Sequence, residues 1–302
     1  MKKLLFFLIT LTFGVGAEVS AQAYFSHPLY LKNRFALNPA AAGLSGGWEI
    51  AGQGGALMQG VDNGPQQAQF TINGAATENT GLGVQVKSFS AGAFQTFIGQ
   101  FAGSYQAYFA DDHFLSFGMA TGIVRKTLDF NGVNPFTDAT DPLINADFFN
   151  RTSFRVEAGL LYQRENLQLS LSLPTLYESD AGSRGNLVAV AAYKLDLGGG
   201  DISLTPLAIF NSYAQQPSVF DGAVMAEWRE TAWLQVGYRS NRSLTVAAGV
   251  RVKELGFGYS YSQPTGEVTD LYSGGHEVLV TVTLGGKQKG APTRNPESME
   301  AP

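Results

Sequence analysis

The sequence predicts an all-β protein, a transmembrane antiparallel β-barrel of about 14 strands with an N-terminal segment outside the barrel wall. Three observations lead to this fold class. The first residues have the pattern expected of an export signal. Most of the remaining chain alternates between apolar and polar residues, in segments near the roughly 9–11 residues that a strand needs to cross a membrane. The connections between these segments are alternately short and long, as in bacterial outer-membrane barrels.

Residues 1–21 are expected to form a signal peptide. Lys2 and Lys3 supply its positive start. An apolar run then extends from Leu4 to Val15 and is followed by small residues up to Ala21. Because the apolar run is shorter than the roughly 20 residues of a spanning helix, we expect cleavage after Ala21 rather than a membrane anchor. The mature chain would then be secreted, periplasmic or embedded as a barrel.

The composition suits a barrel. Charged residues make up 15% of the chain, compared with roughly 25% in soluble domains, yet the mean hydropathy is only -0.02. In a barrel, the apolar face of each strand toward lipid and its polar face toward the interior cancel in the mean hydropathy. The absence of Cys excludes disulfides and thiol chemistry, and a net charge of -5 argues against binding to nucleic acid.

The expected strands are the segments whose side chains alternate with a period of two. They are Trp48–Leu57, Gln66–Ala75, Gly81–Phe89, Phe94–Phe109, His113–Val124, Ser153–Gln163, Leu167–Leu173, Asn186–Leu195, Ile202–Phe210, Val219–Trp228, Trp233–Arg239, Leu244–Val252, Leu255–Tyr261 and His276–Leu284. Alternation alone would also suit a soluble sheet with one wet face. Its presence in nearly every strand, at a length that spans a membrane, favours the barrel.

The connections between these segments orient the barrel. Ala76–Asn79 and Arg164–Asn166 are typical of a short set, and Met58–Pro65 and Arg125–Thr152 of a mostly longer set. Because outer-membrane barrels have short periplasmic turns and long outer loops, both ends of the barrel domain are expected in the periplasm. Aromatic residues near the strand ends are expected to form two interfacial girdles. These are Trp48, Phe89, Phe109, Tyr162, Tyr193, Phe210, Trp228, Trp233 and Tyr261.

Three parts are expected outside the wall, which itself covers residues 48–284. Residues 22–47 would form a periplasmic or plug segment, and residues 285–302 a flexible periplasmic tail. The long outer loop at Arg125–Thr152 is acidic. Its carboxylates could hold calcium, although solvated loop carboxylates are the favoured interpretation. They belong to Asp129, Asp138, Asp141 and Asp147.

Catalytic chemistry has little support in the sequence, so we expect neither an enzyme nor a cofactor. The three histidines, His27, His113 and His276, lie on different elements, and no nucleophile elbow is present. A metal site at His276 and Glu277 is not expected, because neighbours on a strand point to opposite faces. Charges on the polar faces would either line a channel or pair across a filled lumen. They belong to Glu227, Arg239, Arg251, Lys253 and Glu277.

The segment Asn33-Arg34-Phe35-Ala36-Leu37-Asn38-Pro39-Ala40-Ala41-Ala42-Gly43 resembles the N-terminal signature of the PorP/SprF family. These are outer-membrane proteins of the type IX secretion and gliding motility systems of Bacteroidetes. Further similar stretches come in the family order, namely Leu115-Ser116-Phe117-Gly118, Asp141-Pro142, Gly237-Tyr238-Arg239, Gly256-Phe257-Gly258-Tyr259-Ser260-Tyr261 and Gly275-His276-Glu277-Val278. The motif positions expected to serve structure or partner contact are Asn38, Pro39, Gly43, Arg239, Tyr259, Tyr261, His276 and Glu277.

The resemblance implies a protein of the cell outer membrane, surrounded by its lipid, that takes part in protein secretion or display. Its implied partners are a secreted surface protein with a C-terminal sorting domain and periplasmic components of the type IX machinery. Three departures from the family pattern suggest a diverged paralogue. They are the lack of the family's usual aromatic residue near Ala41, Ser262 in place of Asp, and the glycine-rich first strand at Ala51–Gly55.

Two other functions fit parts of the sequence. The stretch Asn38-Pro39-Ala40 before the first strand also resembles the hatch of FadL-type outer-membrane channels for hydrophobic small molecules. That family is usually longer and has apolar outer loops, so the channel ranks second. A soluble exported β-protein that binds glycans ranks third.

Overall fold

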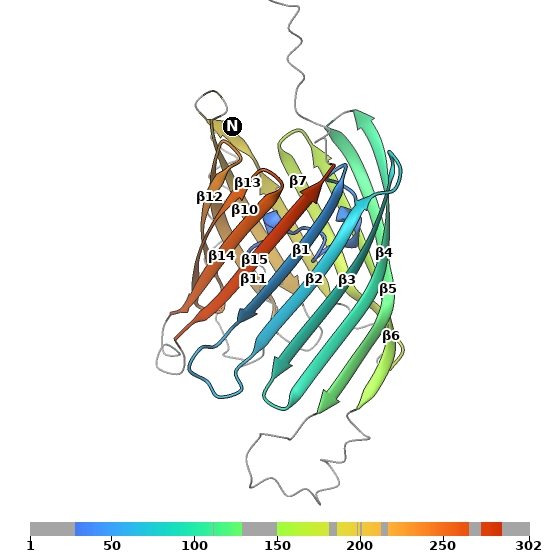
Figure 1. Ribbon diagram of the computed structural model, residues 1–302, viewed down its shortest axis with the longest axis vertical. Coiled ribbons are helices and arrows are strands. Elements are labelled where there is room, and N and C mark those ends of the chain that lie inside the picture. Colours follow the sequence, from blue (N-terminus) through green and yellow to red (C-terminus); the bar gives the residue numbers. More distant parts are fainter. Residues whose placement is uncertain are drawn as a thin grey trace, which may run out of the picture.

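A computed structural model of the chain describes residues 28–110, 112–128, 150–180, 186–197, 199, 201–212, 217–265 and 273–285. These residues form one antiparallel sheet of fifteen strands that closes into a barrel (Figure 1). β8 (Leu187–Tyr193) and β9 (Leu195–Leu197) succeed each other along the same edge of β10 (Ile202–Ser212), so the wall has fourteen strand positions. The predicted fold class is therefore confirmed.

The other strands succeed one another around the barrel in chain order, and each overlaps a segment predicted from the alternation. They are β1 (Trp48–Ala56), β2 (Gln66–Ala75), β3 (Thr80–Ala91), β4 (Phe94–Ala110), β5 (His113–Leu128), β6 (Arg151–Arg164), β7 (Leu167–Glu178), β11 (Val219–Trp228), β12 (Ala232–Arg239), β13 (Ser243–Val252), β14 (Leu255–Pro264) and β15 (Gly275–Leu284). β1 and β15 close the barrel, with Trp48 opposite Leu284 and Ala56 opposite His276.

The two ends of the barrel differ in their connections. At the short-turn end, where β1 begins and β15 ends, the connections are residues 76–79, 111–112, 165–166, 198–201, 229–231 and 253–254. At the long-loop end they are residues 57–65, 92–93, 129–150, 179–186, 213–218, 240–242 and 265–274. The alternation of connection lengths expected from the sequence is confirmed, with two short connections, residues 92–93 and 240–242, among those at the long-loop end. The expected signal peptide, most of the acidic loop and the tail after Gly285 lie outside the described residues.

Several strands extend a few residues past their predicted ends, and two further differences have a visible cause. The expected single strand Asn186–Leu195 is divided at Lys194, whose backbone N–H donates to the carbonyl of Asn166 in a neighbouring turn. β7 continues past Pro174, where the sequence predicted its end at Leu173. Proline is tolerated there because β7 no longer pairs with β8 beyond Ser172 and the β6–β7 ladder is bulged at this level, so no ladder hydrogen bond is lost.

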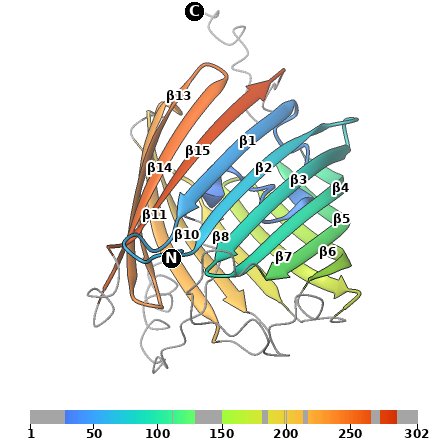
Figure 2. The same ribbon diagram turned by 60° about the horizontal axis from the view of Figure 1, so that its bottom comes forward.

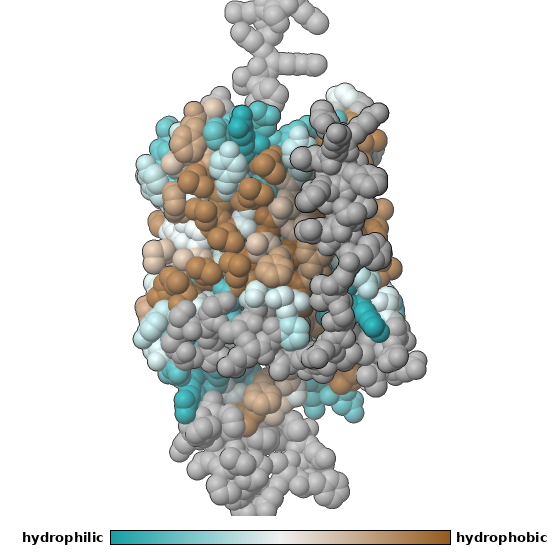
Figure 3. All heavy atoms as spheres, turned by 180° about the vertical axis from the view of Figure 1, so that it is seen from behind, coloured by the Kyte–Doolittle hydropathy of each residue, from teal (hydrophilic) through white to brown (hydrophobic). Residues whose placement is uncertain are grey.

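The outer surface carries a belt of apolar side chains between more polar ends (Figure 3). The belt contains alternate residues of each strand, among them Leu82, Phe101, Phe117, Leu171, Leu234 and Val246. Trp48 and Trp228, which were expected in the interfacial girdles, are about half exposed on this surface. The expectation is wrong for Trp233, which faces the interior and is 8% exposed, packed against Ala51, Met225 and Leu279. Among the described helices, none is long and apolar enough to cross a membrane.

Candidate functional site: a hatch inside the barrel

Residues 28–47 form a hatch that lies within the barrel (Figure 2). The hatch contains two short 3-10 helices, η1 (Tyr30–Lys32) and η2 (Pro39–Ala41), joined by turns. It crosses the lumen near the short-turn end, because Lys32 meets the next-to-last residue of β11 and Gly43 lies against the last residues of β2. The chain then leaves the hatch at Gly47 and enters β1.

Asn38 joins the hatch to the barrel wall. Its Oδ1 accepts a hydrogen bond from the backbone N–H of Ala40 at 2.8 Å and so caps η2. Its Nδ2 donates to Ser170 Oγ at 2.8 Å and to the carbonyl oxygens of Leu160 and Leu171 at 3.0 and 3.1 Å. Asparagine is a preferred N-cap residue, and proline suits the first helical position after it. The side chain is fully buried, so this motif residue builds the hatch from within.

The hatch backbone contacts the wall where the wall strands carry glycine. A Cβ atom added at Gly159 of β6 would lie 1.8 Å from Asn38 Oδ1, and one at Gly118 of β5 would lie 2.2 Å from Ala40 N. At Gly81 of β3, an added Cβ would lie 2.1 Å from the carbonyl oxygen of Ala42. These inward-facing glycines form a cradle that only residues without a side chain can provide.

Gly43 ends the buried part of the hatch. Its φ of +74° lies in the left-handed region that favours glycine, and an added Cβ would lie 2.8 Å from the Cα of Gly81. Its N–H donates to Asn73 Oδ1 of β2 at 3.0 Å. Both the backbone turn and the close approach therefore require glycine at this motif position.

Polar side chains of the wall bind the backbone carbonyls of the hatch. Lys87 Nζ donates to Ala36 O at 2.6 Å, Ser116 Oγ to Ala40 O at 2.7 Å, and Ser104 Oγ to Ala42 O at 2.8 Å. On the opposite wall, Gln235 Nε2 donates to Pro28 O at 2.7 Å. Irregular backbone at membrane depth is stable only where such partners satisfy it, which explains the polar inner faces of these strands.

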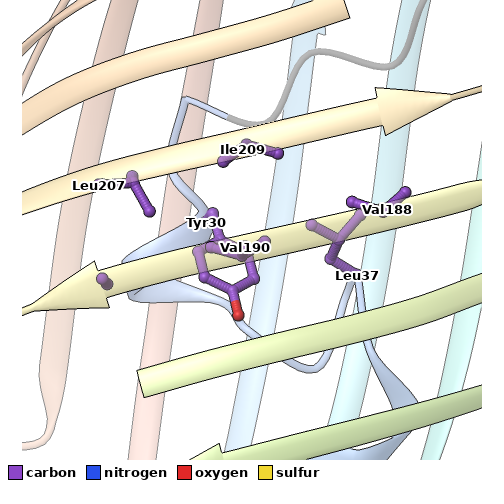
Figure 4. Close-up of a cluster of buried hydrophobic side chains, with 7 residues drawn as sticks. Tyr30, Leu37, Val188, Val190, Leu207 and Ile209 are labelled. Atoms are coloured by element: carbon purple, nitrogen blue, oxygen red, sulfur yellow. The ribbon is translucent and has the colours of Figure 1, made fainter. Parts of the chain in front are cut away.

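The other anchor of the hatch is apolar. Tyr30 and Leu37 pack against Val188, Val190 and Ile209 of β8 and β10 (Figure 4). These two strands therefore carry aliphatic residues on their inner faces, where β2 to β7 carry mostly polar ones.

Lys32 fixes the hatch on the side of β11 and β12. Its ammonium donates to Glu227 at 2.6 Å and lies 5.3 Å from the centre of the Trp233 ring. Burial lowers the pKa of Lys32, and the Glu227 carboxylate opposes that shift. Because the two side chains are only 15% and 17% exposed, the ion pair is far less screened than a surface pair.

A polar layer faces the hatch from the wall. Gln53 Nε2 donates to Glu277 Oε2 at 2.8 Å, and Ser172 Oγ donates to Glu157 Oε1 at 3.3 Å. Arg155 donates to Glu178 at 3.1 Å. Of the charges that the sequence placed on the polar faces, Glu227 pairs with Lys32 of the hatch and Arg239 pairs with Asp221 of β11.

The predicted motif residues do not form one site. Asn38, Pro39 and Gly43 belong to the hatch, whereas Glu277 and Arg239 are wall residues that face inward and bind Gln53 and Asp221. Tyr259, Tyr261 and His276 lie together on the outer wall, where the Tyr259 hydroxyl is 2.5 Å from His276 Nδ1. Lys253 is also not a wall residue as expected, because it occupies the turn after β13 with a φ of +55°.

Sequence reasoning missed the wall residues that receive the hatch, above all Gly118, Gly159, Ser116 and Lys87. The available signal was glycine at inward positions of otherwise well-formed strands. The acidic loop residues considered for calcium lie outside the described residues. Within the described ranges no group of three or more His, Cys, Asp and Glu side chains could hold a metal ion.

Comparison with known proteins gives a family match. The family model described as type IX secretion system membrane protein PorP/SprF matches residues 19–282. No curated protein matches the chain.

Similar solved structures are barrels with low sequence identity. The outer membrane protein Omp33 of Acinetobacter baumannii is 8% identical, with 78% of this chain and 97% of that chain covered and a TM-score of 0.46. The CymD monoaromatic hydrocarbon channel is 11% identical, with coverage of 89% and 94% and a TM-score of 0.49. The toluene transporter TodX of Pseudomonas putida is 9% identical, with coverage of 87% and 94% and a TM-score of 0.45.

Proposed function

Because the chain belongs to the PorP/SprF family of type IX secretion membrane proteins and is an outer-membrane component of that system, we propose that it is a closed anchor, which holds a secreted partner at the cell surface. The long-loop end faces outward and grips the partner. The short-turn end faces the periplasm and contacts the secretion machinery. The partner is a surface protein that carries the C-terminal sorting domain of type IX cargo.

The observation that carries this proposal is the hatch. Its residues from Phe35 to Ala42 are buried, and wall strands on several sides of the barrel bind its backbone. A hatch bound on several sides supports an anchor that keeps one conformation while the ends of the barrel bind partners. The motif residues Asn38, Pro39 and Gly43 then have a structural role in the hatch, and the two ends of the barrel contact the partners.

The chemistry of the lumen disfavours the alternative, a channel for hydrophobic small molecules. Such a channel needs an apolar path. Around the hatch, β2 to β7 present buried amides and charges instead, including Gln85, Gln100 and Glu157. The aliphatic faces of β8 and β10 are covered by Tyr30 and Leu37.

Deletion of the gene tests the proposal. We expect one secreted protein to disappear from the surface proteome and to return when the wild-type gene is restored. Uptake of hydrophobic compounds should be unaffected. Unchanged surface display together with impaired uptake of such compounds would instead establish the channel.

A further inference from the structure

Two recesses of the lumen lie against β11, β12 and β13, one toward each end of the barrel. The long-loop recess encloses about 360 Å³ and lies beside Pro28 of the hatch. The short-turn recess encloses about 330 Å³ and lies beside Lys32. Along β12, Gln235 lines the first recess and Trp233 lines the second. Because these two residues are two positions apart on one strand, the recesses are separated by about 7 Å along β12.

Both recesses are lined by charged side chains. The long-loop recess contains the ion pair of Asp221 and Arg239. The charges of the short-turn recess belong to Lys32, Glu227, Glu230 and Arg251. Charged groups inside a protein are stable only where they are paired or hydrated, and each recess is larger than the roughly 30 Å³ that one water molecule occupies in the liquid. We therefore expect water in both recesses, and in each of them the positive and negative charges are equal in number.

A single apolar layer separates the two recesses. It contains Leu29 of the hatch and three wall residues that pack in the same buried cluster, namely Met225, Trp233 and Ala247. Met225 lies between the β11 residues that line the two recesses, and Ala247 lies between those of β13. Leu29 directly follows Pro28, which lines the long-loop recess. The layer is therefore one side chain thick, and its members are at most 8% exposed.

The indole of Trp233 is the largest side chain in this layer. It covers the backbone of β13 and β14 where these strands carry glycine. A Cβ atom added at Gly249 would lie 2.4 Å from Trp233 Cζ2, and one at Gly258 would lie 3.1 Å from the same atom. Removal of the indole would leave an open groove between the two recesses, because neither glycine has a side chain that could fill the space.

We propose that Leu29, Met225 and Trp233 form an apolar gate, which closes a path for small hydrated ions through the barrel. Narrow apolar constrictions exclude water and thereby stop ions. The path lies on the side of β11 to β14, because the hatch backbone directly contacts the glycine cradle of β3, β5 and β6 across the lumen. Loss of the layer, by substitution or by movement of Leu29 with the hatch, would join the two recesses. The proposal concerns ion flux and does not depend on the role in type IX secretion.

Single-channel recording in planar lipid bilayers, with the purified full-length protein, tests the gate. We expect the unsubstituted protein to be closed and Trp233→Ala to show discrete conductance steps. Because the charges of each recess balance, the reversal potential of these steps in a gradient of KCl should lie near zero. Trp228→Ala is the matched control, since it removes the same side chain from the outer surface and should leave the barrel closed.

Chemical block assigns the current to the proposed path. The chain contains no Cys, so a single cysteine can be introduced into the Trp233→Ala protein. At Thr281, which lines the short-turn recess, its modification by a charged methanethiosulfonate reagent should reduce the conductance. At the neighbouring Val280, which is exposed on the outer surface, the same treatment should have no effect.

A second variant keeps the test valid if Trp233→Ala fails to fold. Met225→Ala thins the same layer without a change to the indole and should also conduct, with folding verified by heat-modifiable migration on a gel. Variants that are folded but closed, or an unsubstituted protein that conducts as well as they do, would overturn the proposal. A current that is strongly ion-selective, or that modification at position 281 leaves unchanged, would also overturn it.

Discussion

Asn38 shows how a single side chain joins the hatch to the barrel wall. It caps η2 and also binds two wall carbonyls and one wall hydroxyl, so it satisfies polar groups on both sides of the contact between hatch and wall. Buried polar groups left without a partner cost about 1–3 kcal/mol each. Substitution of Asn38, or of Gly159 in the wall strand that faces it, should therefore destabilise the contact between hatch and wall.

The substitution Asn38→Ala is expected to loosen the hatch. The carbonyls of Leu160 and Leu171 and the N–H of Ala40 would each lose a hydrogen bond. We expect small dyes to enter liposomes that contain the variant faster than liposomes with the unsubstituted protein. Ser45→Ala, in the partly exposed end of the hatch, serves as the matched control. Equal leakage of both variants would show that the motif acts in assembly or docking instead.

The substitution Gly159→Ala approaches the same contact from the wall. The added methyl group would lie 1.8 Å from Asn38 Oδ1, so the hatch backbone must move. We expect a lower unfolding temperature and dye leakage similar to that of Asn38→Ala. Gly52→Ala is the control, because a Cβ there has no neighbour within 4 Å. If Gly159→Ala were as stable and as tight as Gly52→Ala, the cradle would not hold the hatch.

At the scale of elements, the hatch is assembled from distant parts of the chain. Its carbonyls are bound by β3, β4, β5 and β12, and its side chains pack on β8 and β10. No neighbouring segment dictates its conformation, so the barrel must be nearly complete before the hatch is stable. An element held in this way either stays in place during function or must break many contacts at once.

We predict that the hatch stays in place. Cysteines at Leu37 and Val188, which pack in one cluster, would link the hatch to β8 by a disulfide in the oxidising periplasm. Surface display of the partner should be the same with the link formed and after reduction. Loss of display that is reversed by reduction would show that the hatch moves during function. The single variant Val188→Cys controls for the substitution itself.

At the scale of the whole molecule, the two ends of the barrel are chemically distinct. The short-turn end contains both ends of the barrel domain and the exposed face of the hatch, whereas the long-loop end contains the connections that vary most in length. The proposed anchor role requires this asymmetry, because each end would bind a different partner. The orientation in the membrane therefore decides which surface serves which partner.

Accessibility in intact cells tests the orientation. A cysteine at Val61, which is exposed in the connection between β1 and β2, should react with a membrane-impermeant maleimide from outside. A cysteine at Glu254, in a turn at the short-turn end, should react only after the outer membrane is permeabilised. Because the chain contains no other cysteine, each signal is specific. Labelling of position 254 in intact cells would reverse the proposed orientation.

The sequence alone determined the barrel and most of its strand limits. Alternation with a period of two is a local property, and the lipid and the lumen impose it on each strand separately. It therefore located nearly every strand, although it could not anticipate the break at Lys194 or the continuation of β7 past Pro174.

Only the tertiary structure showed that the hatch crosses the lumen and which strands hold it there. The hatch has no periodic pattern, because its contacts come from strands up to 207 positions away in the sequence. Trp233 also packs against residues that are distant in the sequence, such as Ala51 and Leu279, and this explains why the prediction of an interfacial position is wrong. Alternation identifies two faces of a strand, but an aromatic residue near a strand end suits either a lipid interface or a packed interior. The closed barrel and its hatch determine which of the two it occupies.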